Sequence, residues 1–187
     1  MTNITSSAFF TDRKMKVLHF HQKTVMNSFM IYLPDNMGLM PKELARIKYP
    51  SEFRPRVLLT TLDLSTNLGF SLFHRKTQDD EIQKICERMM GAIKREHADY
   101  RFFGCQNIPE IRGCQFSFRS HAMDTDLFNM MLVAQVAEQT VLGNFNCLYQ
   151  DYKPWKELIL VTWKTIQTIG EEEKAHNERS KNCNSTF

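Results

Sequence analysis

The sequence predicts an α+β fold: a central antiparallel β-sheet of about six to eight strands, with two long amphipathic helices and one short helix packed on it. Segments of strand length mostly follow one another with short connections, which favours antiparallel pairing over parallel crossovers. Two longer segments carry apolar stripes at helical spacing, so each predicted helix needs an apolar surface to cover. Glycine and proline are scarce, at 7 and 6 of 187 residues, which leaves little of the chain for long loops.

The length of the chain predicts one domain. Its 187 residues are about one domain's length, and the 42% that are apolar suffice for a core. We expect a single α/β sandwich domain over residues 14–169, preceded by a flexible arm over 1–13 and followed by a polar tail over 170–187. The arm is rich in Thr, Ser and Asn, and the tail carries charges of both signs.

The first part of the chain predicts four strands and one short helix. Apolar, β-branched and aromatic residues at strand length predict strands at 14–22, 28–33, 56–64 and 68–74. Pro34-Asp35-Asn36 ends the second strand, and Pro41 suits the first turn of a short helix over 41–47. Pro50 and Pro55 bracket an extended loop before the third strand.

A long helix over 77–97 carries the clearest local pattern. Thr77-Gln78-Asp79-Asp80 is a loose capping-box start, and Lys94 and Arg95 suit the negative end of the helix dipole. One apolar stripe runs along it at the spacing of a helix face: Ile82, Ile85, Cys86, Met89 and Ile93.

The rest of the chain predicts strands at 100–106, 113–122, 126–133 and 140–149, then a final helix. Pro154 suits the first turn of that helix, its apolar stripe continues through Ile166 and Ile169, and Gly170 ends it. In the strand 113–122, one face alternates as Cys114, Phe116 and Phe118, and the other as Gln115, Ser117, Arg119 and His121. This polar row is either a recognition face or an ordinary solvated surface, and the sequence leaves both open.

Charge and apolar content predict neither a nucleic-acid partner nor membrane insertion. The formal net charge is only +3, and the basic residues are scattered in pairs instead of forming a stripe. The longest uninterrupted apolar run, 130–134, is far below the ~18 residues of a membrane span. The N-terminus lacks the pattern of a secretory signal, and the five cysteines show no C-x-x-C spacing, so we expect a cytoplasmic protein with reduced thiols.

Recognisable catalytic and cofactor motifs are missing. The sequence contains no G-x-G-x-x-G, no G-x-x-x-x-G-K-[ST] and no G-x-S-x-G. Its seven glycines are scattered singly, which does not build a phosphate cradle. We therefore expect no enzymatic activity, no catalytic residues and no cofactor.

Two short patterns could be interpreted as metal sites, but each has a simpler interpretation. His19 and His21 share a strand face, but zinc needs at least a third ligand, and a solvated or hydrogen-bonded face is the simpler reading. Asp124-Thr125-Asp126 lacks the glycine and distal glutamate of a calcium loop, so a turn between strands explains it better. We expect no metal site.

The cysteines are predicted to be small core residues. Cys105 and Cys114 flank a turn and could lie across from each other in a hairpin, where a disulfide would need an oxidising compartment. Neither has a recognisable base partner that would make it a nucleophile. Cys86 belongs to the apolar stripe of the helix 77–97. Buried, unreactive thiols are the interpretation we adopt for all three.

The loop 35–40 and the segment that follows the short helix give the first candidate for a contact surface. Apolar side chains in a loop either tuck beneath it or meet a partner, and methionine suits adaptable surfaces. Both alternatives stay open for the two methionines of the loop. The candidate partner-contact residues are Met37, Met40, Tyr49, Phe53 and Arg54.

Several segments resemble a known fold family. They are Phe29-Met30-Ile31-Tyr32-Leu33-Pro34, Lys48-Tyr49-Pro50 with Arg54-Pro55, Leu68-Gly69-Phe70-Ser71-Leu72, and Gly143-Asn144-Phe145-Asn146-Cys147 followed by Trp155. With the order of elements over 14–169, they resemble the PsbP-like α/β-sandwich superfamily, which includes PsbP, the Ran-binding Mog import factor and bacterial DcrB-like proteins. The resemblance implies a shared sandwich fold, no common catalysis and the binding of other proteins.

Together these observations predict a non-enzymatic, protein-binding domain with an accessory or chaperone-like role. Its partner is another protein that the sequence does not identify. The alternative is a small-ligand-binding or metabolic protein that uses a pocket between sheet and helix. An enclosed pocket with converging polar groups would favour the alternative, and a packed interior with an open apolar surface would favour protein binding.

Overall fold

Seven antiparallel strands form the large sheet of the computed structural model, which describes residues 6–11, 14–122 and 125–169. Across this sheet the strands are β4 (Met37–Leu39), β5 (Val57–Thr61), β6 (Asn67–Phe73), β10 (Gln139–Leu148), β9 (Asp126–Val136), β8 (Gly113–His121) and β7 (Arg101–Ile108). Every adjacent pair is antiparallel. The predicted α+β class and its central antiparallel sheet are therefore confirmed.

A smaller sheet contains the strands from the two ends of the described chain. Its order is β1 (Ser6–Thr11), β2 (Lys14–Val25), β3 (Phe29–Pro34) and β11 (Gln167–Thr168). The backbone of β1 pairs with β2 from Ser6 opposite His19 to Thr11 opposite Lys14, within the stretch predicted to be an arm. The rest of that arm, residues 1–5 and 12–13, and the predicted tail 170–187 lie outside the described residues.

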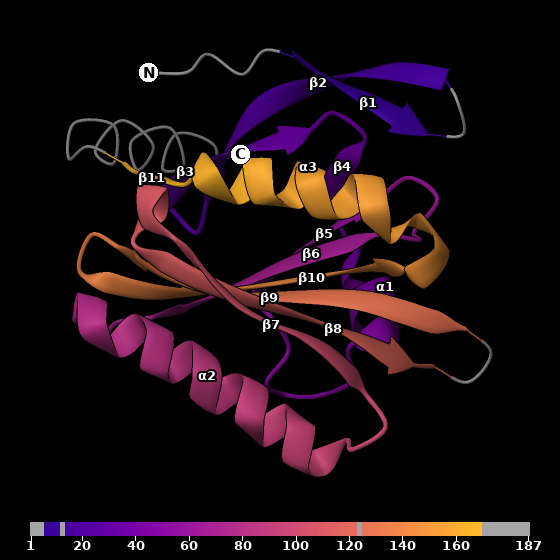
Figure 1. The fold of residues 1–187 in the computed structure, drawn as a ribbon. Helices are drawn as coiled ribbons and strands as arrows, with labels where there is room; N and C mark the ends of the chain where they lie inside the picture. The colour runs from indigo at the N-terminus through magenta and orange to yellow at the C-terminus, as the bar shows by residue number, and fades with distance from the viewer. Residues whose placement is uncertain (1–5, 12–13, 123–124, 170–187) are drawn as a thin grey trace.

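The helices separate the layers (Figure 1). The helix α3 (Tyr152–Lys164) lies between the large sheet and the small one, and α2 (Asp79–Glu96) covers the opposite face of the large sheet. A short helix, α1 (Lys42–Lys48), connects β4 to β5 at one edge. Because helices cover both faces of the large sheet, polar residues such as Gln115 and Ser117 on β8 are buried. They belong to the polar row that was predicted to be solvated or to recognise a partner.

Two apolar clusters fill the spaces between these layers. The larger lies between the large sheet, α3 and β3, and includes the fully buried Trp163. In this cluster the Phe29 and Phe70 rings meet edge to face, with 5.4 Å between centroids. The smaller cluster lies between the large sheet and α2, and its buried members are Ile82, Cys86, Cys114, Phe116, Phe118 and Val133.

The helix α2 begins at Asp79, two residues after the predicted start. Gln78 is the N-cap, and a capping box joins it to Glu81. The stripe that was predicted for this helix packs on the large sheet through Ile82 and Cys86.

Contacts between distant residues explain two further differences between the structure and the predicted elements. The segment Met37–Leu39 was expected to be loop, but it pairs with β5, with Met37 opposite Thr61. The final helix was expected to run to Gly170, but α3 ends at Lys164. There the Thr165 hydroxyl accepts a hydrogen bond of 2.9 Å from the Tyr32 N–H, which ties the chain to β3.

Candidate functional site

The edge of the large sheet at β4 and α1 presents apolar side chains to solvent. Leu39, Ile47, Phe53 and Leu62 are exposed there, on β4, α1 and the loops on either side of β5. Such side chains are normally buried, and several of them near one edge mark a candidate binding surface. We define the β4–α1 surface as residues 39–58.

A hollow of about 380 Å³ lies within the β4–α1 surface. Its lining combines apolar residues of β4 and β5 with four basic side chains: Leu39, Met40, Lys42, Ala45, Arg46, Arg54, Pro55, Arg56, Val57 and Leu58. This lining contains no acidic residue, although Glu43 and Glu52 occur on the same segments. The lining of the hollow therefore offers both apolar contact and positive charge.

A turn in the loop after α1 holds Phe53 out of the core. The Ser51 hydroxyl accepts a 3.1 Å hydrogen bond from the Phe53 N–H, and the Ser51 carbonyl accepts one of 3.1 Å from the Arg54 N–H. Phe53 is 96% exposed, while the neighbouring Arg54 lines the hollow. Of the five predicted contact residues, these two lie at the surface, and their contact with a partner stays a prediction.

Polar contacts tie the C-terminal end of α1 to the sheet. The Tyr49 hydroxyl accepts a 2.9 Å hydrogen bond from Asn146, which itself accepts one of 2.9 Å from Asn67. Lys48 donates to the Leu64 carbonyl. Burial raises the pKa of the Tyr49 phenol and lowers the pKa of the Lys48 ammonium. Tyr49 is thus a partly buried anchor beneath the predicted contact surface.

The two loop methionines lie under the surface. Met37 is 2% exposed and belongs to the larger apolar cluster, and Met40 is 7% exposed at the floor of the hollow. Of the two alternatives that the sequence leaves open, the tucked position describes both side chains. Met37 pairs with Thr61 on β5, and its side chain packs into the larger apolar cluster.

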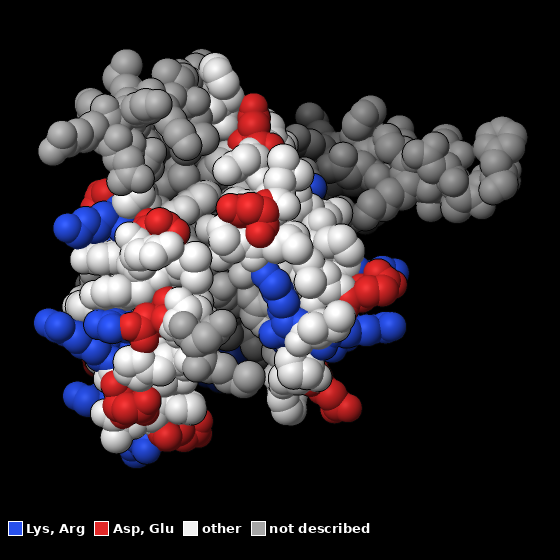
Figure 2. All heavy atoms as spheres, turned by 90° about the vertical axis from the view of Figure 1, so that its right-hand side faces the viewer, with Lys and Arg blue, Asp and Glu red and all other residues white. Residues whose placement is uncertain are grey.

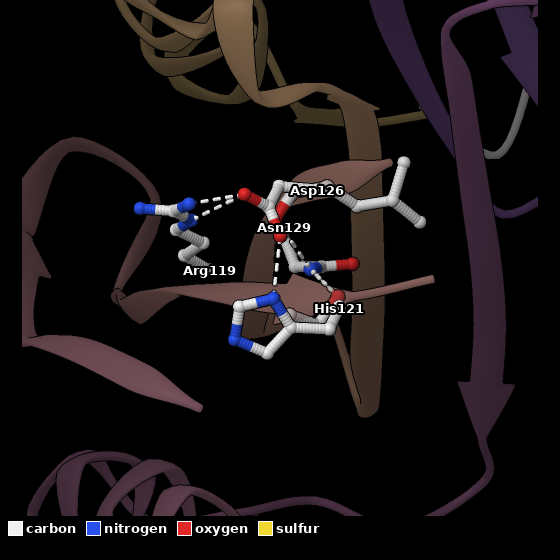
Figure 3. A network of polar contacts seen from close by, with 6 residues as sticks. Arg119, His121, Asp126 and Asn129 are labelled. Atoms are coloured by element: carbon white, nitrogen blue, oxygen red, sulfur yellow. Dashed lines mark hydrogen bonds and ion pairs between the residues drawn. The ribbon is translucent and has the colours of Figure 1, made fainter. Parts of the chain in front are cut away.

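A second polar cluster lies at the hairpin of β8 and β9 (Figure 3). The Asp126 carboxylate accepts hydrogen bonds from Arg119, at 3.0 Å from its Nε, and contacts the His121 ring. The Arg119 guanidinium also lies 4.5 Å above the centre of the Tyr149 ring. The hydrogen bonds of Arg119, and then of His121, lower the pKa of Asp126. Its neighbours occupy this carboxylate, and Asp126 begins the strand β9 instead of lying in the predicted turn. Asp124 lies outside the described residues.

Three cysteines that were predicted to be separate core residues converge where α2 packs on the large sheet. Cys86, Cys105 and Cys114 come from α2, β7 and β8, and their sulfur atoms all lie within 4.8 Å of one another. Their hydrogen bond raises the pKa of Cys86 and lowers that of Cys114, while burial raises the pKa of Cys105. Among the His, Cys, Asp and Glu side chains of the described residues, these three thiols lie close enough together to hold a metal ion.

The other predicted features lie apart from these sites. The ring of His21 contacts the Asp35 carboxylate at 3.2 Å, in keeping with a hydrogen-bonded strand face. On the face shown in Figure 2, Lys and Arg lie interspersed with Asp and Glu and do not form one patch. Within the described part of the chain, no helix has both the length and the apolar character to cross a membrane.

Comparison with known proteins identifies the fold. No protein family and no curated protein matches the sequence. Cyanobacterial PsbP (CyanoP) from Synechocystis sp. PCC 6803 has a similar solution structure, with a TM-score of 0.59 at 10% identity over 80% of this chain and 92% of CyanoP. The Ran-binding protein Mog1p from Saccharomyces cerevisiae has a TM-score of 0.55 at 4% identity over 83% of this chain and 98% of Mog1p. The chain has the fold of the PsbP-like superfamily.

Proposed function

We propose that this protein is a non-enzymatic binding domain whose β4–α1 surface holds a segment of another protein. The observation that carries the proposal is the apolar hollow of about 380 Å³ lined by Lys42, Arg46, Arg54 and Arg56. Mog1p, which has the same fold, is a Ran-binding protein, and that supports protein binding as a use of this architecture. An accessory or chaperone-like role follows from shielding such a segment.

The chemistry of the hollow indicates the kind of segment. Four basic residues and no acidic residue in its lining favour acidic side chains in the partner. The apolar floor at Met40 and Leu58 favours an apolar side chain beside them. The proposed ligand is therefore a peptide segment with an apolar residue flanked by Asp or Glu, and Phe53 supplies a further apolar contact.

The packing of the interior supports this proposal over the small-ligand alternative. The two spaces between the large sheet and its helices are filled by the apolar clusters. Exposed residues make up half of the lining of the hollow at β4 and most of the lining of a second hollow of about 310 Å³ beside the start of α2. Both shapes suit a segment of a protein better than an enclosed metabolite. The described cysteines are free thiols, which fits the cytoplasmic location that we propose.

Labelled synthetic peptides test the proposal directly. The probe contains Leu or Phe flanked by Glu, and two control peptides replace Glu with Lys or the apolar residue with Gly. We expect the acidic apolar peptide to bind in fluorescence anisotropy, more weakly at high salt, and to shift amide NMR signals of residues 39–58. Failure of every acidic peptide to bind, or equal binding of the Lys control, would overturn the proposal.

Matched variants locate the binding. Arg54→Glu with Arg56→Glu, and separately Phe53→Ala, are each expected to weaken the acidic peptide by roughly 10-fold. Arg75→Glu and Phe73→Ala alter an exposed cation and an exposed apolar residue outside the β4–α1 surface and serve as controls. Equal losses in the controls would place the binding elsewhere and reject this surface.

A further inference from the structure

We propose that Cys86, Cys105 and Cys114 form a binding site for monovalent copper. The sulfur atoms come from three separate elements and all lie within 4.8 Å of one another. With metal–sulfur bonds of about 2.3 Å, three thiolates on one ion lie about 4 Å apart, so the observed cluster needs only small side-chain shifts. This inference is independent of the proposed protein-binding surface.

The antiparallel register explains why the two strand cysteines meet. Cys105 lies opposite Phe116, and Cys114 lies opposite Asn107, so they are diagonal neighbours on the same face of the β7–β8 hairpin. The bulge between Phe102 and Cys105 shifts this part of β7 relative to β8. The hairpin therefore presents both thiols to α2.

The helix supplies the third thiol and a thioether. Cys86 and Met90 are four residues apart on α2 and share one face of it. The Met90 sulfur lies 3.8 Å from the Cys105 sulfur. A thioether is a soft ligand like the thiolates, and sets of Cys and Met sulfur atoms favour Cu(I). A fourth sulfur thus lies beside the Cys105 thiol of the group without any change of fold.

The surroundings of the cluster suit a monovalent ion held by soft ligands. Cys86 and Cys114 are fully buried among apolar residues such as Phe116 and Val133. Cys105 is only partly buried, which leaves one side open for the ion to enter. An apolar shell that limits water preserves Cu(I), and a partly open side permits exchange with a donor.

The simpler reading is that three small apolar residues fill space in the core. That reading explains the burial of Cys86 and Cys114. It does not require the sulfur atoms of three elements to converge, nor a methionine sulfur to lie beside the partly exposed member. Cys147 shows the contrast, since it is equally buried in the larger cluster and is not part of the thiol group.

Copper titration of the full, reduced chain tests the site. Cu(I) is added without oxygen against a chromophoric chelator, with Zn(II) in a parallel titration. We expect one equivalent of Cu(I) held by sulfur ligands in X-ray absorption, and a rise in melting temperature on binding. Failure to compete with the chelator, or binding of Zn(II) as tight as that of Cu(I), would overturn the copper site.

Variants separate this site from adventitious thiol binding. Cys105→Ser is the key change. Cys105 is partly exposed whereas Cys86 and Cys114 are buried, so this substitution is the least expected of the three to unfold the protein. Circular dichroism checks that the variant is folded. We expect it to lower Cu(I) affinity at least 100-fold, and Met90→Leu to lower it by about 10-fold. Cys147→Ser and Cys183→Ser are the controls. Unchanged binding in Cys105→Ser, or an equal loss in either control, would refute the assignment.

Discussion

Pro55 packs directly against the backbone of Gly69. A β-carbon on Gly69 would lie 2.8 Å from Pro55 Cγ and would also collide with the Asn144 side-chain oxygen. Gly69 is the position where β6 lets the loop after α1 approach the sheet, between Leu58 on β5 and Asn144 on β10. This contact sets where the β4–α1 surface lies relative to the strands.

Gly69→Ala is therefore expected to destabilise the domain. The added methyl group must displace Pro55 or Asn144, and overpacking of this kind costs about 1–3 kcal/mol of unfolding free energy. Gly38→Ala is the matched control, because a β-carbon there meets nothing within 4 Å and the change should stay within about 0.5 kcal/mol. Urea denaturation measures both, and equal stability of the two variants would contradict the packing argument.

An element could be predicted from the sequence where the residues that specify it lie within one short segment of the chain. The helix α2 has a capping box and a stripe such as Ile82 and Cys86, all inside one stretch of chain, so its position followed from periodicity. The end of α3 could not be predicted from periodicity, because Ile166 and Ile169 continue the apolar spacing beyond Lys164. After the helix, Thr165 contacts the distant Tyr32, to which no local pattern refers.

The candidate sites also differ in whether local sequence or only tertiary packing brings their residues together. Phe53 and Arg54 were predicted to be contact residues and lie in a predicted loop between two prolines, and both are exposed. The thiol cluster was missed because Cys86 lies on a helix that reaches the β7–β8 hairpin only through tertiary packing. The signal that could have found it is the shared face of Cys105 and Cys114, taken together with the apolar stripe of the helix.

Thr165→Val should loosen the junction between α3 and the small sheet. The Thr165 hydroxyl accepts from the Tyr32 N–H at 2.9 Å and donates to the Thr162 carbonyl at 2.6 Å. Valine keeps the shape but leaves the Tyr32 amide without this partner, at a cost of about 1–3 kcal/mol. Hydrogen exchange of the Tyr32 amide should speed up, whereas exposed Thr168→Val should leave it unchanged. Slow exchange in both variants would reject this role.

Phe70→Ala should destabilise the protein far more than Phe53→Ala. Phe70 is fully buried in edge-to-face contact with Phe29, so its removal leaves a cavity between the large sheet and β3 and costs about 3–5 kcal/mol. Phe53 is 96% exposed, and its removal should change the stability by about 0.5 kcal/mol or less. Thermal unfolding measures both changes. A large loss in Phe53→Ala would mean that this side chain serves the fold and not a binding surface.

The Asp126 cluster predicts a loss of stability at acid pH. Hydrogen bonds from Arg119, then from His121, hold the pKa of Asp126 below its ordinary value of 3.8, so folding favours the charged carboxylate. Its contribution is therefore present above pH 3.8 and is lost as the pH falls from there through the lowered pKa.

Asp126→Asn removes that charge at every pH. The melting temperature of the variant should lie below that of the natural protein at neutral pH, and the difference should shrink as the pH falls below 3.8. Asp99→Asn, at an exposed position away from this hairpin, should show no such convergence. A gap that stays constant through the acid range would mean that Asp126 acts by its shape and hydrogen-bonding alone. A gap that narrows as expected makes the carboxylate the electrostatic link between β8 and β9.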